Sequence, residues 1–197
     1  MRTASGSSDH SVRWLTTTLA AVAILAFTAL VELRLGRLPF CKCGIIRLWS
    51  GDIWSNQASQ QFTDPYTFTH IIHGVLWYML VWWIAGKRLS TGARFLAAVL
   101  IESAWEIFEN TDFVIQRYRT VTISLDYYGD SVFNSMGDIV AMMSGYFLAA
   151  RLPVRVTIAA AVLLDLFLLF WYRDSLALNI LMLIYPVDAI KNWQMFR

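Results

Sequence analysis

The stretch WLTTTLAAVAILAFTALVEL, residues 14–33, sets the fold class of this chain. At a helical rise of about 1.5 Å per residue, a stretch of this length crosses about 30 Å of membrane hydrocarbon. It is longer than the apolar region of a signal peptide, and no A-x-A-like cleavage site follows it, so we expect a retained membrane anchor. Residues 1–13 are mostly small and polar, which predicts a disordered N-terminal tail.

Further apolar runs predict the rest of the fold. They cover residues 69–86, 91–109, 132–150, 155–172 and 175–187. The last run is short, which fits a short sixth span, a re-entrant segment or an interfacial helix. The chain of 197 residues is 57% hydrophobic and 15% charged, an apolar share far above that of soluble domains. We therefore predict an all-α, multi-pass transmembrane helical bundle of five or six spans, one domain over residues 14–197 with a long loop at 34–68.

The placement of lysine and arginine predicts the orientation of this bundle. With six spans and a cytoplasmic N-terminus, nine of these residues lie in inner segments and seven in outer segments. This excess favours a cytoplasmic N-terminus. The formal net charge of +2 gives no case for nucleic acid binding, so membrane lipids are the partners that we expect.

Two stripes of polar residues run into the apolar segments. One stripe holds Asp126, Asp130, Asn134 and Asp138, and the other holds Glu102, Glu106 and Asn110. Residues four apart stack on one face of a helix, so each stripe forms a continuous polar face. A carboxylate in hydrocarbon is unfavourable by several kcal/mol unless it is paired or ligated, which makes these residues candidates for a functional site.

A pair of histidines, His70 and His73, opens the second apolar run, and their spacing places both rings on one helix face. Because successive spans alternate in direction, the second and fourth spans begin at the end of the bundle where the third span ends. The histidines and both acidic stripes therefore converge in a one-ended pocket, whichever way the protein is inserted. With a cytoplasmic N-terminus, this pocket is periplasmic.

Such a pocket suits a divalent metal ion, since a bound cation lets several carboxylates lie close together. Two histidines with carboxylates from neighbouring helices are a suitable ligand set. The metal ligands expected from the sequence are His70, His73, Glu106, Asp130 and Asp138. The catalytic side chains expected from it, as bases or as groups that position substrate or water, are Glu102, Glu106, Asp130 and Asn134.

The leading interpretation is a metal-dependent hydrolase that acts on a lipid-linked or envelope substrate. One alternative is an ion or proton transporter that uses the same acids as a relay, and another is a non-catalytic assembly protein whose polar core fixes helix register. The apolar inner halves of the second to fourth spans favour a blind pocket over a channel. No Walker loop, dinucleotide fingerprint, G-x-S-x-G or H-E-x-x-H motif occurs, so whether the protein is an enzyme stays open.

Two smaller features lie close to the same end of the bundle. Cys41-Lys42-Cys43-Gly44 could bind a soft metal or undergo a redox change, although a disulfide over two residues is sterically demanding and a tight turn closing on Gly44 is the simpler interpretation. Trp105 lies between Glu102 and Glu106, where it would form a wall of the pocket.

Several strings occur together in a fixed order. They are SQQFTDPYTFTHIIHG from Ser59, then ESAWEIFEN, RYRTVTISLDYYGDSVFNSMGD and RDSLALNILMLIYP. In these strings the chain resembles a bacterial membrane-protein family, domain of unknown function 2585, also called uncharacterised protein family 0314. The resemblance covers roughly residues 33–195. It implies a multi-pass inner-membrane protein and no particular chemistry.

Overall fold

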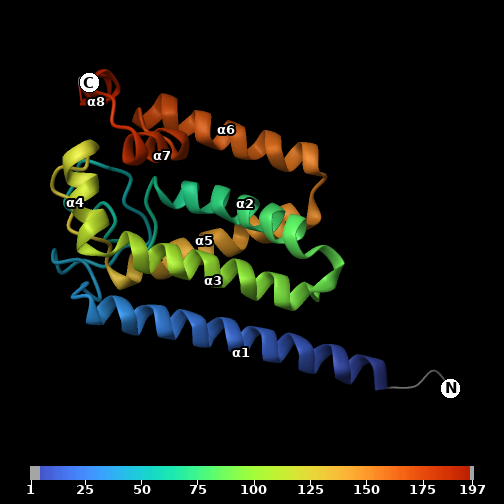
Figure 1. The fold of residues 1–197 in the computed structure, drawn as a ribbon. Helices are drawn as coiled ribbons and strands as arrows, with labels where there is room; N and C mark the ends of the chain where they lie inside the picture. Colours follow the sequence, from blue (N-terminus) through green and yellow to red (C-terminus); the bar gives the residue numbers. More distant parts are fainter. Residues whose placement is uncertain (1–4, 196–197) are drawn as a thin grey trace.

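The computed structural model describes residues 5–195, and within this range the chain forms α-helices, one short 3-10 helix and connecting loops (Figure 1). The prediction of an all-α fold is confirmed. The elements are α1 (Ser5–Arg34), α2 (Thr67–Ala85), η1 (Gly86–Arg88), α3 (Thr91–Glu109), α4 (Asp112–Val121), α5 (Val132–Arg151), α6 (Val154–Tyr172), α7 (Leu176–Ile184) and α8 (Asp188–Met195).

The apolar runs located the long helices well, and α2, α3, α5 and α6 each begin and end within two residues of a predicted run. Polar caps fix two of these starts, because the side chains of Ser90 and Ser131 accept hydrogen bonds from backbone N–H groups in the first turns of α3 and α5. Helix α1 begins earlier than expected, at Ser5, so residues 5–13 of the predicted disordered tail are helical. Residues 1–4 of that tail lie outside the described residues.

Within the described residues, three helices are long and apolar enough to cross a membrane, over Val12–Arg34, Thr67–Arg88 and Val154–Tyr172. Helices α3 and α5 have similar lengths of 19 and 20 residues, but their charged side chains lower their hydropathy. Helix α7 has 9 residues and extends about 14 Å, roughly half of the 30 Å of hydrocarbon that a full span crosses. The count of five or six spans therefore stays a prediction, with five long helices available to supply it.

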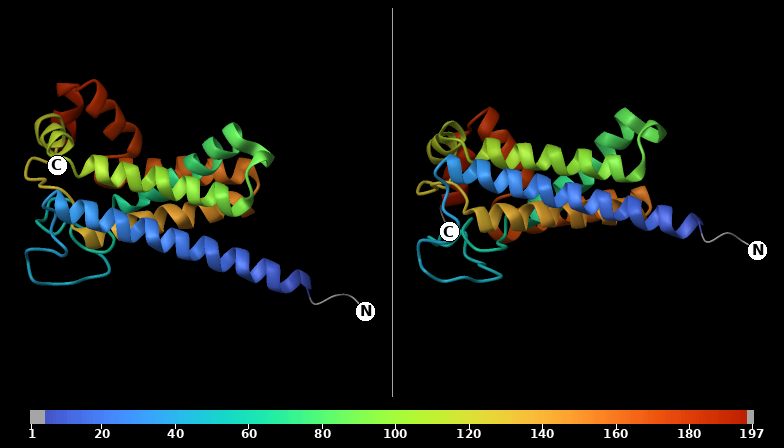
Figure 2. Two further views of the ribbon diagram at one scale, coloured as in Figure 1. Left: turned by 60° about the horizontal axis from the view of Figure 1, so that its bottom comes forward. Right: turned by 90° about the horizontal axis from the view of Figure 1, so that it is seen from below.

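Helices α2 and α5 lie against each other in the centre of the bundle, with α1 beside α3 and α6 beside α2 (Figures 1 and 2). Glycines allow this close contact. A Cβ atom on Gly74 would overlap the carbonyl oxygen of Met142, and one on Gly145 would overlap that of Ile71. Backbone thus packs directly on backbone, which fixes the register of α2 against α5.

The apolar core occupies the half of the bundle near the start of α3 and the end of α5. It includes the buried side chains of Ala21, Phe95, Ala98, Val99, Ile139, Met142 and Tyr146. At the opposite end, α4, α7, α8 and the loop 35–66 gather around the start of α2 (Figure 2). This second end carries the polar residues.

Helix α4 is an element that the sequence analysis did not predict. Thr111 caps its first turn by accepting a hydrogen bond from the backbone of Val114. The helix buries Val114, Ile115, Tyr118 and Val121, an apolar face at helical spacing. It brings Tyr118 to the polar end of the bundle.

Candidate functional site

The two histidines lie in the first turns of α2 and are buried, with exposed fractions of 7% for His70 and 6% for His73. Their ring centroids are 5.0 Å apart. As predicted from their spacing, both imidazoles leave the same face of the helix. That face is turned toward α3.

A single carboxylate of α3, Glu102, receives the histidine pair. Its Oε1 lies 2.7 Å from His70 Nδ1 and 3.1 Å from His73 Nδ1, and Trp77 donates to its Oε2 at 2.5 Å. Donor atoms of His70, His73 and Glu102 all lie within 4.8 Å of one another, so this trio could hold a metal ion. A role for Glu102 in positioning substrate or water stays a prediction, and the structure adds that its carboxylate lies close enough to both histidines to share a metal ion with them.

Glu106, one turn further along α3, is a buried carboxylate with few partners. Its Oε1 lies 3.2 Å from His70 Nδ1, yet neither carboxylate oxygen accepts a hydrogen bond from the described residues. A buried carboxylate without such partners is strongly unfavourable unless a proton or a cation neutralises it. Glu106 is therefore expected to bind either a proton or a cation in the folded protein.

Asp138 of α5 faces the histidines from the other side. Its Oδ2 lies 3.8 Å from His70 Nε2, and its Oδ1 accepts a hydrogen bond of 2.8 Å from the hydroxyl of Thr67. His70 thus has carboxylates near both ring nitrogens, Glu102 and Glu106 at Nδ1 and Asp138 at Nε2. The contact between Nε2 and Asp138 is at ion-pair distance and is too long for a hydrogen bond.

Asp130, which was expected among the metal ligands, lies just before α5 and has its own partners. Asn110 donates to its Oδ2 at 3.0 Å and Tyr127 to its Oδ1 at 3.0 Å, while its backbone N–H donates to Asn110. Burial raises its pKa to about 6, and the hydrogen bonds from Asn110 and Tyr127 oppose this rise. Asp130 lines the same cavity as the histidines, but it is not part of the compact trio.

Asn134 was expected to position substrate or water, and the structure gives its amide another partner. Its Nδ2 donates to the backbone carbonyl of Gln61 at 2.8 Å. Nearby, the Ser131 hydroxyl donates to the carbonyl of Gln60, and Gln60 donates to the carbonyl of Gly129. These bonds attach the loop 35–66 to the start of α5. A catalytic role for Asn134 stays a prediction.

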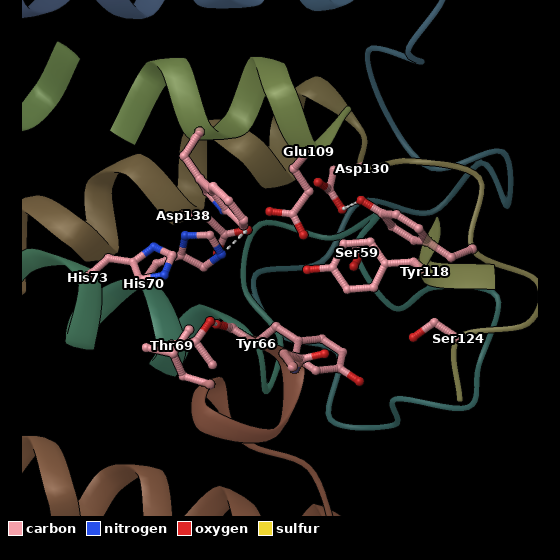
Figure 3. A pocket seen from close by; sticks show the side chains of 14 residues that line it. Ser59, Tyr66, Thr69, His70, His73, Glu109, Tyr118, Ser124, Asp130 and Asp138 are labelled. Carbon is pink, nitrogen blue, oxygen red and sulfur yellow. Dashed lines mark hydrogen bonds and ion pairs between the residues drawn. The ribbon is translucent and has the colours of Figure 1, made fainter. Parts of the chain in front are cut away.

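His70, His73, Asp130 and Asp138 line a cavity of about 60 Å³ at the polar end of the bundle, whereas Glu102, Glu106 and Asn134 are not among its lining residues (Figure 3). His70 and His73 lie at one end of the cavity, and Tyr118 and Ser124 lie at the other. Trp105 also lines the cavity, as predicted from its place between two acids. The volume holds a few water molecules or one small chemical group.

The loop before α2 is connected to the site through Asp64. Its buried carboxylate accepts hydrogen bonds from the backbone N–H groups of Ser59 at 2.6 Å and Tyr66 at 2.8 Å. Its own N–H donates to the hydroxyl of Thr67, which in turn donates to Asp138. Burial raises the pKa of Asp64, and the backbone donors oppose the rise. Loop and site are therefore joined by a continuous set of hydrogen bonds.

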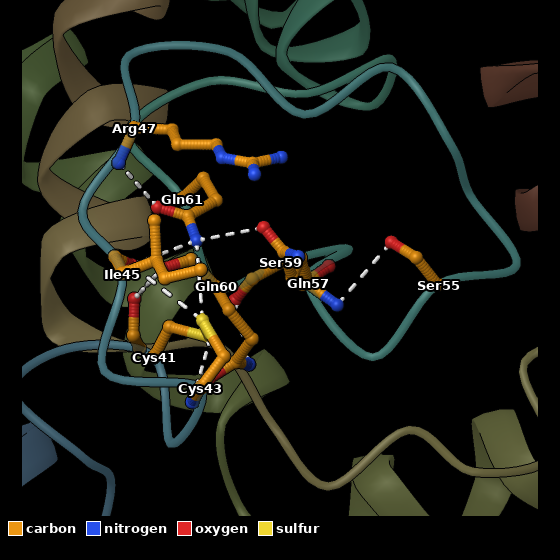
Figure 4. Close-up of a disulfide and its surroundings, with 10 residues drawn as sticks. Cys41, Cys43, Ile45, Arg47, Ser55, Gln57, Ser59, Gln60 and Gln61 are labelled. Carbon is orange, nitrogen blue, oxygen red and sulfur yellow. Dashed lines mark hydrogen bonds between the residues drawn. A yellow bond between two sulfur atoms is a disulfide. The ribbon is translucent and has the colours of Figure 1, made fainter.

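Cys41 and Cys43 form a disulfide in this loop (Figure 4). The expected turn is also present, since the N–H of Gly44 donates to the carbonyl of Cys41. The fully buried side chain of Gln61 lies beside the disulfide. Its Nε2 lies 3.6 Å from Cys43 Sγ, and its Oε1 accepts a hydrogen bond from the N–H of Arg47. The turn and the disulfide occur together.

Some site residues were missed that the sequence could have supplied. Trp77 follows His73 by four residues and so shares its helix face. Tyr118 has the helical spacing to Val114 that marks the buried face of α4. Tyr127, in a loop without periodicity, carried no comparable signal.

Comparison with known proteins assigns the chain to a family. Residues 32–196 match the family described as "Protein of unknown function (DUF2585)". The chain belongs to this family. A UPF0314 protein of Rhizobium meliloti is 50% identical in an alignment of 202 positions that covers 98% of each chain.

Two further relatives agree with this assignment. A UPF0314 protein of Paracoccus denitrificans is 49% identical over 89% of this chain and 90% of its own. A UPF0314 protein of Brucella anthropi is 44% identical over 97% of this chain and 96% of its own. The resemblance seen in the sequence strings is confirmed. No solved structure matches the chain.

Proposed function

We propose that this protein is a multi-pass inner-membrane hydrolase that binds one divalent metal ion through His70, His73 and Glu102. The proposal rests on one observation, the buried trio whose donor atoms lie within 4.8 Å of one another. Two histidines and one glutamate are the protein ligands of known catalytic zinc sites, in which water takes the fourth position. Zn²⁺ is the first metal to test for this donor set.

Glu106 would act as the general base in this site. Its unpartnered carboxylate lies one helical turn from Glu102, beside the Nδ1 atom of His70. A carboxylate in this place can accept a proton from metal-bound water, whose pKa the cation lowers. The negative charge of Asp138, 3.8 Å from Nε2 of His70, would favour a proton on Nε2 and so leave Nδ1 free for the metal.

The size and position of the cavity indicate the substrate class. A volume of about 60 Å³ admits a scissile group and water but not a whole lipid. The apolar core below the site, with Val99, Ile139 and Met142 fully buried, favours a blind pocket over a transport path. The substrate we propose is a lipid-linked or envelope molecule that presents an ester or phosphoester at the membrane surface.

Metal analysis of the purified protein tests this proposal. We expect about one Zn²⁺ per chain in the wild type, loss of the metal in His73→Ala, and retained metal without turnover in Glu106→Gln. Turnover is followed with fluorogenic ester and phosphodiester lipids in mixed micelles. His10→Ala, which changes the third histidine of the chain, and Asp126→Asn, an exposed acid, are the matched controls.

Absence of bound metal together with full function of His73→Ala and Glu106→Gln would overturn the hydrolase proposal. The structural alternative then gains, because Glu102 already accepts hydrogen bonds from both histidines and from Trp77. In that case the trio pairs α2 with α3 and fixes their register, as in a non-catalytic assembly protein.

A further inference from the structure

The end of the bundle opposite the candidate site is strongly basic. The basic residues at this end are Arg13, Lys87, Arg88, Arg94, Arg151 and Arg155. Three stretches build this end, residues 12–31, 76–101 and 139–164, and none of them contains an aspartate or a glutamate.

A cavity of about 310 Å³ lies among these charges, between α1, α2, α3 and α5. Two guanidinium groups line it, those of Arg94 and Arg151, together with Trp14, Tyr78 and Tyr146. Two like charges on one cavity repel each other unless an anion lies between them. The arrangement thus favours an anionic ligand.

Arg94 is held in place for such a ligand. Its Nη1 donates to the carbonyl of Gly86 at 2.7 Å, and the guanidinium lies 5.4 Å above the ring of Trp82. A second, longer bond of 3.4 Å reaches the hydroxyl of Thr91. A guanidinium has five N–H donors, so a fixed Arg94 still presents donors to the cavity. Arg151 is placed similarly, 5.7 Å above the ring of Phe147.

The geometry points to the phosphate headgroup of an anionic membrane lipid as the ligand of this cavity. Arginine binds phosphate through paired N–H donors, and basic cavities between spanning helices on the cytoplasmic side hold anionic headgroups. The aromatic walls, with Trp14 and Phe147, suit the boundary between headgroup and acyl chain. This inference rests on the membrane insertion proposed above and is independent of the metal site.

Lipid titration of the purified protein in an uncharged detergent tests this inference. Binding of phosphatidylglycerol and of phosphatidylcholine with the same acyl chains is measured by native mass spectrometry. We expect the wild type to prefer phosphatidylglycerol, and Arg94→Gln and Arg151→Gln each to weaken that binding about fivefold. Arg155→Gln is the matched control, because Arg155 lies at the same end but does not line the cavity.

Arg151→Gln keeps the test decisive if Arg94→Gln fails to fold, because Arg151 is exposed and bonds no helix end in the described structure. Equal binding of the two lipids by the wild type would overturn the inference, as would an equal loss in Arg155→Gln. Displacement of phosphatidylglycerol by millimolar inorganic phosphate would also overturn it, in favour of a free anion. Unchanged Zn²⁺ content in the arginine variants separates this result from the site at the other end.

Discussion

Glu102 offers the sharpest test of the site, because two substitutions at this position separate packing from metal binding. Three side chains of α2 converge on its carboxylate, His70 and His73 on Oε1 and Trp77 on Oε2. Glu102→Ala removes both acceptor oxygens, and with them all three hydrogen bonds, from a fully buried position. Glu102→Gln keeps the shape of the side chain and removes its charge.

The expected stability changes follow from counting donors and acceptors. A hydrogen bond to a charged group contributes about 1.5–3 kcal/mol, but three bonds at one carboxylate are not additive, so we expect Glu102→Ala to lose about 4 kcal/mol. In Glu102→Gln, the amide oxygen can accept from Trp77 while the amide NH₂ donates to both Nδ1 atoms. Every partner stays satisfied if both imidazoles are neutral, so the loss should stay below about 1 kcal/mol.

Metal affinity should fall strongly in Glu102→Gln, although this substitution changes stability little. A neutral amide is a poor ligand for Zn²⁺, and a lost ligand should weaken binding by more than the roughly 10- to 100-fold effect of an outer-shell change. Stability is measured by unfolding in mixed micelles with increasing SDS, and affinity by titration of metal-free protein. Wild-type affinity in Glu102→Gln would refute the assignment of Glu102 as a ligand. Equal stability of Glu102→Ala and the wild type would refute the packing argument.

Two further outcomes follow from the structure. Gly145→Val should lower the free energy of unfolding by about 3 kcal/mol and shift the histidines, because any Cβ there overlaps the backbone of Ile71. Ser144→Val, at the neighbouring exposed position, is the control. An equal loss in both variants would contradict this reasoning. Burial raises the pKa of Asp174 from 3.8 to about 6, so the folded state binds this proton more tightly than the unfolded state. The resulting stabilisation is complete below pH 3.8 and is lost as the pH rises through about 6, a change of about 3 kcal/mol that Asp174→Asn should abolish. Identical slopes of unfolding free energy against pH in wild type and Asp174→Asn would exclude this source.

The sequence was sufficient for the long helices and for the meeting of their polar residues. Apolar runs located α2, α3, α5 and α6, and the alternation of helix direction placed the histidines and the acids of α3 and α5 at one end. The predicted stripe from Asp126 to Asp138 is not one helix face, because Asp126 and Asp130 lie in the loop before α5, which begins at Val132. Periodicity could not say which acid meets His70 and His73. Glu102 and Glu106 lie one turn apart on the same face, and the contact depends on how far α3 slides along α2.

Axial register depends on local fit that a single sequence hides. The contact of α2 with α5 is fixed where Gly74 meets the backbone of Met142 and Gly145 meets that of Ile71. From the sequence, Gly145 indicates a close helix approach, but it does not say which residue of which helix lies against it. The loop 35–66 was beyond prediction for another reason, since its order comes from side-chain bonds such as Asp64 to Ser59 rather than from any period.

The most apolar long helices, α1 and α6, carry none of the candidate site residues, whereas the less apolar α3 carries two of them, and the packing explains this difference. Helices α1 and α6 have the most apolar spans, and only 11% of each window is buried inside the protein. Helix α3 lacks such a span because Glu102 and Glu106 are buried within it, in contact with or close to the histidines of α2. Under the proposed membrane insertion, α1 and α6 meet lipid and separate the acids from it, so a helix with a low hydropathy is the one to search for chemistry.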